Sequence, residues 1–282
     1  MDSLTIPGPH GTIPIRVYRA AGADASPALV WAHGGGFAWG ELDMPEAHWV
    51  SEQLAALGVT VVSVDYRLAP VSEALTDGEP ARDGVRFPVA SEEVATAFRW
   101  AVQHATEWGI DSGRVSLGGA SAGGNLAAGA AMRLRDAGGP HPVSLMLAYP
   151  LVHSVLPEPT AALARMIALL PAEARFEPAD VRALNLNYVG DPAELANPYA
   201  FPGGHDPAGL PPTFILNSDH DSLRSSGQAF AAELALAGVD VTVYHEPGTR
   251  HGHLNEPDNA GARASIHRMA AWLTQNPSRA VS

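Results

Sequence analysis

The sequence predicts an α/β fold in which helices cover both faces of a mostly parallel β-sheet. Short β-rich runs alternate with longer helical patterns, as expected where helices connect parallel strands. Most of these runs are continuously apolar, which is typical of strands buried on both faces. Hydrophobic residues make up 46% of the 282-residue chain and charged residues 17%, so a large core can form and an intrinsically disordered protein is excluded.

The elements follow in a regular order along the chain. The predicted strands are residues 13–18, 28–32, 59–65, 115–118, 144–149, 213–217 and 241–245. The predicted helices between and after them are residues 46–57, 92–107, 122–136, 225–237 and 260–273.

Two segments interrupt the alternation. Residues 151–200 hold proline-bounded helical pieces at 161–170 and 179–189 without a strand between them, which predicts a helical lid inserted into a core made of residues 1–150 and 201–282. Residues 71–86 form a glycine- and proline-containing loop with several charges. A loop of this length is often functional, although a solvated surface excursion fits the pattern equally well.

Composition excludes several classes of function. The formal net charge of −13 argues against a nucleic-acid-binding protein, because phosphate neutralisation needs a basic face. All 17 basic residues are arginine, which excludes lysine-based chemistry, and the absence of cysteine excludes thiol catalysis and disulfides. No apolar stretch approaches a membrane span, and the first residues do not resemble a secretory signal, so cytoplasmic residence without a membrane partner is expected.

A strand-turn-helix motif carries the strongest chemical signal. The predicted strand 115–118 leads into Gly119-Ala120-Ser121-Ala122-Gly123-Gly124 and then into a helical pattern. In this context G-x-S-x-G places a serine at a strained turn, with its hydroxyl exposed beyond the sheet edge. The following helix directs its free N–H groups toward the serine.

A second glycine motif favours a catalytic site at Ser121 over an ordinary strand-to-helix turn. The predicted strand 28–32 ends in His33-Gly34-Gly35-Gly36-Phe37, where consecutive glycines expose main-chain N–H groups. Such donors suit an oxyanion hole, in which each donor contributes roughly 3 kcal/mol of transition-state stabilisation. His33 itself is interpreted as structural, with its ring hydrogen-bonded to the loop backbone.

Acid and histidine candidates follow two later strands. Asp219 and Asp221 come after residues 213–217, and His251 and His253 come after residues 241–245. Because the carboxyl ends of parallel strands meet at one sheet edge, these side chains are expected near Ser121. The order serine, acid, histidine is the order in which a hydrolytic triad follows a nucleophile elbow.

Together these motifs resemble the hormone-sensitive-lipase-like group of α/β-hydrolase esterases. The resemblance also rests on Asp65-Tyr66-Arg67-Leu68-Ala69-Pro70 and on Gly209-Leu210-Pro211-Pro212 before Asp221-Ser222-Leu223-Arg224, and it covers residues from about 28 onward. It implies an eight-stranded, mostly parallel sheet and no cofactor. The catalytic residues that it implies are Ser121 as nucleophile, His251 as base and Asp221 as its acid, with Gly35, Gly36 and Ala122 as oxyanion-hole donors.

The sequence departs from the family pattern at several positions. Ala120 stands where the family commonly has aspartate, Val71 replaces a frequent glutamate, and His253 stands where phenylalanine is usual. Few residues precede His33, so the N-terminal lid helices of the family are expected to be missing. The predicted consequence is a more open pocket, covered by residues 151–200 with a contribution from the loop 71–86.

Competing assignments remain for some of these residues. Asp221 is preferred to Asp219 as the acid, and His251 to His245, which lies within a strand pattern. His253 is assigned to the substrate site or to a solvated surface, and Phe37 and Trp39 to the substrate site or to the core. A zinc site made by residues 219, 220, 221, 251 and 253 leaves both glycine motifs unexplained, so no metal is predicted.

The predicted function is therefore hydrolysis of short-acyl carboxylic esters through an acyl-enzyme. Lactones, carbamates and amides are alternative substrates of the same triad, and a non-catalytic ligand-binding protein is the rival of a different class. The expected partner is a small-molecule ester, and the expected state is a monomer or a homodimer.

Overall fold

A single eight-stranded sheet forms the centre of the protein. The computed structural model describes residues 1–22, 25–71, 75 and 80–275. The strand order is β1-β2-β4-β3-β5-β6-β7-β8, in which β1 and β2 are antiparallel to their neighbours and the remaining strands are parallel. This confirms the mostly parallel sheet expected from the sequence. The strands are β1 (Asp2–Gly8), β2 (Gly11–Tyr18), β3 (Ser26–Ala32), β4 (Thr60–Val64), β5 (Ile110–Ala120), β6 (Leu145–Ala148), β7 (Thr213–His220) and β8 (Val241–Arg250).

The degree to which each strand is buried explains which strands could be predicted from the sequence. Every residue of β3 and β4 is buried, which matches their continuous apolar runs. β1 was not predicted, because it lies at the sheet edge and only Ile6 among its seven residues is fully buried. Such an edge strand leaves only a weak periodic signal in the sequence.

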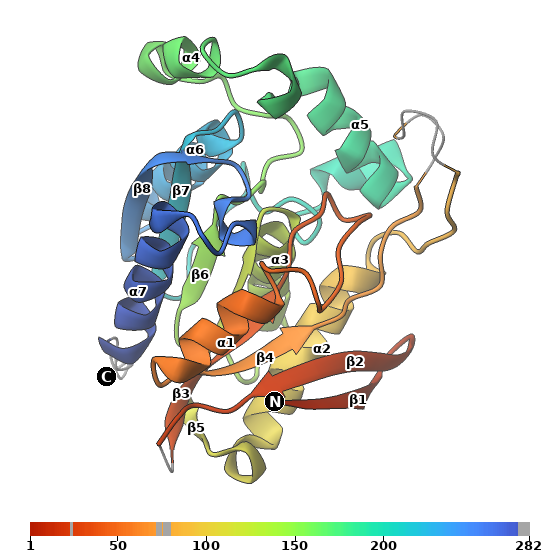
Figure 1. Ribbon diagram of the computed structural model, residues 1–282. Coiled ribbons are helices and arrows are strands. Elements are labelled where there is room, and N and C mark those ends of the chain that lie inside the picture. The colour runs from red at the N-terminus through yellow and green to blue at the C-terminus, as the bar shows by residue number, and fades with distance from the viewer. Residues whose placement is uncertain (23–24, 72–74, 76–79, 276–282) are drawn as a thin grey trace.

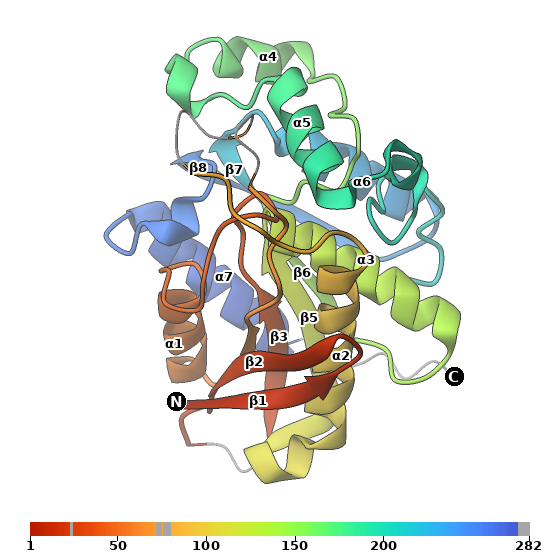
Figure 2. The same cartoon turned by 90° about the vertical axis from the view of Figure 1, so that its right-hand side faces the viewer.

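Five helices cover the two faces of the sheet (Figures 1 and 2). On one face the packing includes Trp31, Leu54 and Met269, and on the other it includes Phe98 and Phe230. Burying side chains of this size contributes about 1.5–3 kcal/mol each, so these two apolar layers stabilise the packing of the helices on the sheet. The first face carries α1 (His48–Ala56) and α7 (Ala260–Gln275), and the second carries α2 (Val89–Gln103), α3 (Ala122–Ala137) and α6 (Arg224–Leu236).

The chain between β6 and β7 lies over one end of the sheet. It contains the helices α4 (Ala161–Ile167) and α5 (Pro178–Val189), and Figure 2 shows both at the opposite end of the molecule from the β1–β2 hairpin. Thr160 caps α4 by accepting a hydrogen bond from Leu163 N–H, and Pro178 begins α5 at a position where no N–H is needed. Both helices predicted in this insertion are therefore present. In the described residues the same insertion also contains short 3-10 turns at Ala172–Ala174 and Pro192–Ala196, and further 3-10 turns lie at Ala105–Trp108 and His253–Asn255.

The loop 71–86 was expected to contribute to the cover of the pocket, and the segment ahead of His33 was expected to lack lid helices. Residues 72–74 and 76–79 of the loop lie outside the described residues. In its described part, Val71 pairs with Arg82, and the Arg82 guanidinium donates a hydrogen bond to the carbonyl of Ala38. Residues 1–22 and 25–32, the described part of the chain ahead of His33, form strands and turns without a helix. None of the helices in the described residues is long and apolar enough to cross a membrane.

Candidate active site

Ser121 occupies the sharp turn between β5 and α3. Its backbone has φ 52° and ψ −117°, a conformation that L-residues rarely adopt, and Ser121 N–H donates to Ala148 O at 2.8 Å. A Cβ atom on Gly119 would collide with the carbonyl of Gly123, and one on Gly123 would collide with the carbonyl of Ala32. The close approach of these backbones explains both glycines of the motif and confirms the predicted strand-turn-helix context.

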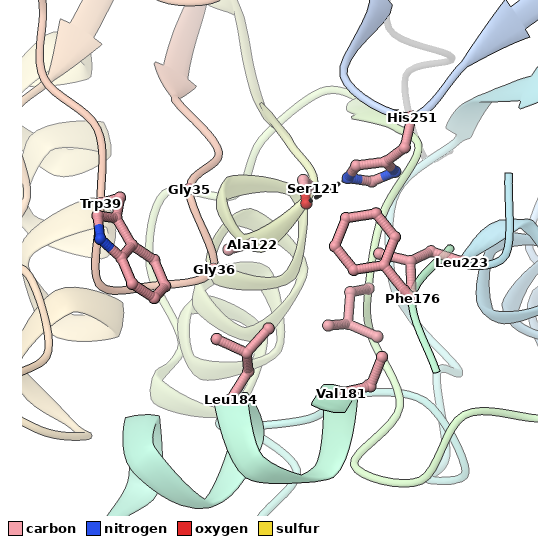
Figure 3. Close-up of a pocket in the computed structure, with 11 residues that line it drawn as sticks. Gly35, Gly36, Trp39, Ser121, Ala122, Phe176, Val181, Leu184, Leu223 and His251 are labelled. Carbon is pink, nitrogen blue, oxygen red and sulfur yellow. Dashed lines mark hydrogen bonds between the residues drawn. The ribbon is translucent and has the colours of Figure 1, made fainter. Parts of the chain in front are cut away.

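Ser121, His251 and Asp221 form one hydrogen-bonded chain. The Oγ atom of Ser121 lies 2.9 Å from Nε2 of His251, and Nδ1 of His251 lies 2.7 Å from Oδ2 of Asp221. Figure 3 shows the serine and histidine side chains facing each other. An ionised carboxylate only accepts hydrogen bonds, so the imidazole proton is assigned to Nδ1 and Nε2 is free to accept from the serine hydroxyl.

Each member of this chain follows the carboxyl end of a parallel strand. Ser121 comes directly after β5, Asp221 directly after β7 and His251 directly after β8. The Asp221 side chain is fully buried, and its Oδ1 atom accepts Leu223 N–H at 2.9 Å, which fixes the carboxylate toward the histidine. The His251 side chain is 13% exposed. The sheet therefore determines where the three groups meet.

The environment of His251 raises the pKa of its imidazole above 6.5. Burial alone lowers this pKa, because a charged ring loses its hydration. The negative charge and hydrogen bond of Asp221, and then the negative charge of Glu46, act in the opposite direction and prevail. The site therefore stabilises an imidazolium, the form that a histidine takes after it accepts a proton.

The glycine-rich loop after β3 lies beside the serine. Gly35, Gly36 and Ala122 line the same cavity as Ser121 and His251. The Gly35 carbonyl accepts hydrogen bonds from the N–H groups of residues 38 and 39 at 3.0 and 2.8 Å, and Gly35 has φ 110°, so the loop is tightly folded around a residue without a side chain. Ala122 is the first residue of α3, where N–H groups have no intrahelical partner.

His33 has the structural role that its position suggested. Its Nδ1 atom lies 2.7 Å from Gly34 O, and its ring stacks on Tyr66 with the centroids 4.5 Å apart. The Tyr66 hydroxyl donates to His33 O at 2.8 Å. The imidazole of His33 therefore stabilises the glycine-rich loop on the side away from the cavity.

The cavity in front of Ser121 is small and largely apolar. It has a volume of about 240 Å³. Figure 3 shows Val181 and Leu184 projecting into it from α5, with Trp39 on the side away from His251. Phe176 lies edge-on to His251, the ring centroids being 4.9 Å apart. The described lining residues are Gly35, Gly36, Trp39, Ser121, Ala122, Leu151, Phe176, Val181, Leu184, Leu223 and His251.

Two residues predicted to bind substrate lie elsewhere. Phe37 is 1% exposed and stacks on Tyr188 with the ring centroids 4.1 Å apart, so it belongs to the core. His253 is fully buried, with its ring nitrogens 2.9 Å from the hydroxyls of Ser218 and Ser265. The assignment of both residues to the substrate site is corrected, whereas Trp39 does line the cavity.

The competing acid and base candidates are occupied by other partners. Asp219 forms an ion pair with Arg224 at 2.9 Å and accepts Gly248 N–H, and His245 lies 3.1 Å from Arg224. Their positions leave Asp221 and His251 as the pair that reaches Ser121. In the described residues no group of three or more His, Asp or Glu side chains is arranged to hold a metal ion.

Sequence reasoning missed much of the cavity wall. It recognised residues 179–189 as helical, but which side of that helix faces Ser121 depends on how the insertion folds back over the sheet. The spacing of Val181 and Leu184, three positions apart, was the one available signal for a shared apolar face. Phe176 and Leu223 lie in irregular segments whose direction has no periodic signature.

Two buried histidines predict acid sensitivity of the fold. Burial lowers the pKa of His33 and of His253 to about 4, against 6.5 ordinarily. Below pH 6.5 the unfolded chain binds protons that the folded chain excludes, so the free energy of unfolding should fall by about 3 kcal/mol per histidine between pH 6.5 and pH 4. Urea unfolding of His253→Gln across this range should show a smaller fall than the unmodified protein. The same change at the exposed His141 should leave the fall unaltered.

Comparison with known proteins identifies the family and the fold. Residues 29–255 match a protein family described as alpha/beta hydrolase fold. The carboxylic ester hydrolase LipN of Mycobacterium tuberculosis is 36% identical over 99% of this chain and 71% of its own length, and the carboxylesterase NlhH of the same organism is 36% identical over 86% and 72%. The structure of a hyperthermophilic esterase from the archaeon Pyrobaculum calidifontis superimposes with a TM-score of 0.81 at 32% identity, covering 97% of this chain and 85% of that one. The chain thus belongs to the alpha/beta hydrolase fold family, as its resemblance to the hormone-sensitive-lipase-like esterases predicted.

Proposed function

We propose that this protein is a serine carboxylesterase that hydrolyses short-acyl esters through Ser121, His251 and Asp221. The observation that carries the proposal is the unbroken hydrogen-bonded chain from the serine hydroxyl through the imidazole to the buried carboxylate. The relatives named above are ester hydrolases at 36% identity, which supports the same bond class for this chain.

The first half of the reaction follows from where the proton can go. His251 Nε2 accepts the hydroxyl proton as Ser121 Oγ bonds to the ester carbonyl carbon, and Asp221 stabilises the resulting imidazolium. The carbonyl oxygen becomes negative and faces the N–H groups of Gly35, Gly36 and Ala122, where each donor contributes about 3 kcal/mol. His251 then gives its proton to the alkoxide as the ester C–O bond breaks, which leaves an acyl-enzyme and a free alcohol.

The second half regenerates the enzyme with water. His251 accepts a proton from a water molecule as the water oxygen bonds to the acyl carbon. The same main-chain donors stabilise the carbonyl oxygen, which becomes negative a second time. The imidazolium returns the proton to Ser121 Oγ when the acyl bond breaks, and the carboxylic acid leaves. Because only neutral His251 can accept a proton, activity should decline as the pH falls through the raised pKa of this residue.

The insertion between β6 and β7 is proposed to act as the lid, with residues 1–150 and 201–282 as the core. Four of the side chains that line the cavity belong to it: Leu151, Phe176, Val181 and Leu184. An apolar wall of this kind suits the hydrocarbon part of an ester and offers few hydrogen-bonding groups to a charged or highly polar substrate. Cytoplasmic residence and a monomeric or homodimeric state remain predictions.

A panel of matched substrates tests this function. We expect p-nitrophenyl acetate and butyrate to be hydrolysed with much higher kcat/KM than the laurate, because a 240 Å³ cavity bounded by α5 does not accommodate a long extended chain. The corresponding p-nitroanilides should be cleaved at least 100-fold more slowly. Faster cleavage of an anilide, a lactone or a carbamate than of every ester would replace the ester assignment, and no turnover of any of them would favour a ligand-binding protein.

A further inference from the structure

One buried acid beside the site has no part in the mechanism so far. Glu46 lies just ahead of α1 and is 2% exposed, behind the glycine-rich loop and away from the cavity. Among the described residues it is unusual in having no basic side chain as an ion-pair partner, whereas the equally buried Glu93 pairs with Arg67 at 3.0 Å. A buried carboxylate without a cation is costly unless hydrogen bonds stabilise it.

Three donors converge on the Glu46 carboxylate. Its Oε2 atom accepts Gly34 N–H at 2.5 Å, and its Oε1 atom accepts the Tyr149 hydroxyl at 2.5 Å and Asn255 Nδ2 at 3.2 Å. The pKa of Glu46 is raised from its ordinary value because burial outweighs the opposing effect of the hydrogen bonds from Tyr149 and Gly34. Main-chain and amide N–H groups can only donate, so the arrangement is fully satisfied when the carboxylate is ionised.

Each donor belongs to a different segment that carries part of the site. Gly34 directly precedes the two glycines of the proposed oxyanion hole. Tyr149 follows β6 and packs edge-on to His251, with the ring centroids 5.0 Å apart. Asn255 lies four residues after His251, and its side-chain oxygen also accepts the Glu46 main-chain N–H at 3.1 Å. One carboxylate therefore connects the glycine-rich loop of residues 33–37, here called the oxyanion loop, with residues 251–255, here called the histidine loop.

The charge of Glu46 also acts on His251. The titratable groups around this imidazole are Asp221, in direct hydrogen bond, Tyr149, in ring contact, and Glu46 and His253 at longer range. The pKa of His253 is lowered to about 4, so this neighbour is neutral near pH 7 and adds no positive charge. Glu46 is then the second negative charge, after Asp221, that favours the imidazolium.

We propose that Glu46 is a positioning residue that holds the oxyanion loop and the histidine loop in one arrangement and supports the charge that His251 acquires. The inference rests on the proposed function, because it assigns His251 the role of base. Glu46 does not contact the cavity. It acts through Gly34 on the donors of the negative oxygen, and through Asn255 and its own charge on the imidazole.

The variant Glu46→Gln separates this role from a purely structural one. Glutamine keeps the size of the side chain, but it removes the charge and places an amide group against Gly34 N–H or against Tyr149 and Asn255. We expect kcat to fall by roughly 10–100-fold with a smaller change in KM, because misplaced oxyanion donors lose mainly transition-state stabilisation. The acidic limb of the kcat/KM profile should move to lower pH by about half a unit, because the imidazolium loses a favourable charge.

Two further variants serve as matched controls. Glu46→Asp keeps the charge but shortens its reach, so kcat should fall while the acidic limb stays closer to that of the unmodified enzyme. Glu93→Gln removes the charge of a carboxylate that is equally buried but bonded to Arg67, so it should lower the thermal midpoint and leave both kcat and the pH profile unchanged. Unmodified kcat and an unmoved pH profile in Glu46→Gln would overturn the proposal, whatever the loss of stability.

A measurement without substrate keeps this test independent of the esterase assignment. Titration of the His251 ring by NMR should give a lower pKa in Glu46→Gln than in the unmodified protein. An equal pKa would contradict the electrostatic part even if the protein hydrolyses no ester. Should Glu46→Gln not fold, Asn255→Ala keeps the charge and breaks the link to the histidine loop; we expect a lower kcat, and an unchanged kcat would contradict the positioning role.

Discussion

Ser121→Ala is expected to reduce kcat for p-nitrophenyl butyrate by roughly 10⁵–10⁶-fold, since Ser121 carries the only hydroxyl among the described residues that line the cavity. Alanine keeps the Cβ atom, so the strained backbone at φ 52° is no less favourable than with serine and the fold should be retained. The measurement is steady-state hydrolysis with the variant purified from a host free of other esterases. Residual turnover reflects substrate binding and the oxyanion donors alone.

The molecule supplies its own control for this experiment. Ser226 lies 2.9 Å from His153, and His153 lies 3.0 Å from Glu233, so a second serine, histidine and carboxylate are hydrogen-bonded in sequence away from the cavity. Ser226 is fully buried and also accepts Val152 N–H. Ser226→Ala should therefore lower stability without a comparable loss of kcat. Near-normal hydrolysis by Ser121→Ala would show that Ser121 is not the nucleophile.

Asp221→Asn is expected to lower kcat by roughly 10⁴-fold. The asparagine amide can donate to Nδ1 of His251, which favours the tautomer with the proton on Nε2. That tautomer cannot accept the hydroxyl proton of Ser121 across the 2.9 Å hydrogen bond. The geometry of the site is otherwise preserved, so KM should change little, and the loss should appear in single-turnover acylation.

Asp219→Asn is the matched control, two residues away on the same strand end. Its carboxylate holds Arg224 and Gly248 N–H and is not bonded to His251. We expect less than a tenfold change in kcat from this variant, because it alters a loop contact and not the tautomer of the base. A larger loss at position 219 than at position 221 would mean that the acid has been assigned to the wrong residue.

The sequence predicted that Ser121, Asp221 and His251 come together because each follows a strand that is easy to recognise. Buried parallel strands leave continuous apolar runs, and their carboxyl ends meet at one edge, so the residues just beyond 118, 217 and 245 had to gather there. The choice between Asp219 and Asp221 needed the family resemblance. The structure accounts for it by extending β7 to His220, which places Asp221 first beyond the strand.

The residues that sequence reasoning misplaced depend on partners far along the chain. Phe37 lies in the oxyanion loop, yet its ring packs on Tyr188 from the insertion. His253 lies in the histidine loop, but hydroxyls at 218 and 265 enclose it. The sequence placed Glu46 as the first residue of a predicted helix. Its role became visible only in the structure, where Tyr149 and Asn255 donate hydrogen bonds to its carboxylate.

Covalent labelling tests the central claim most directly. The protein is incubated with a p-nitrophenyl alkylphosphonate, a reagent that traps an activated serine, and the digested protein is read by peptide mass spectrometry. We predict one adduct per chain, on Ser121, formed in step with the loss of ester hydrolysis and absent from His251→Ala. Full inactivation with the label on another residue, or retained hydrolysis with Ser121 fully labelled, would contradict the account.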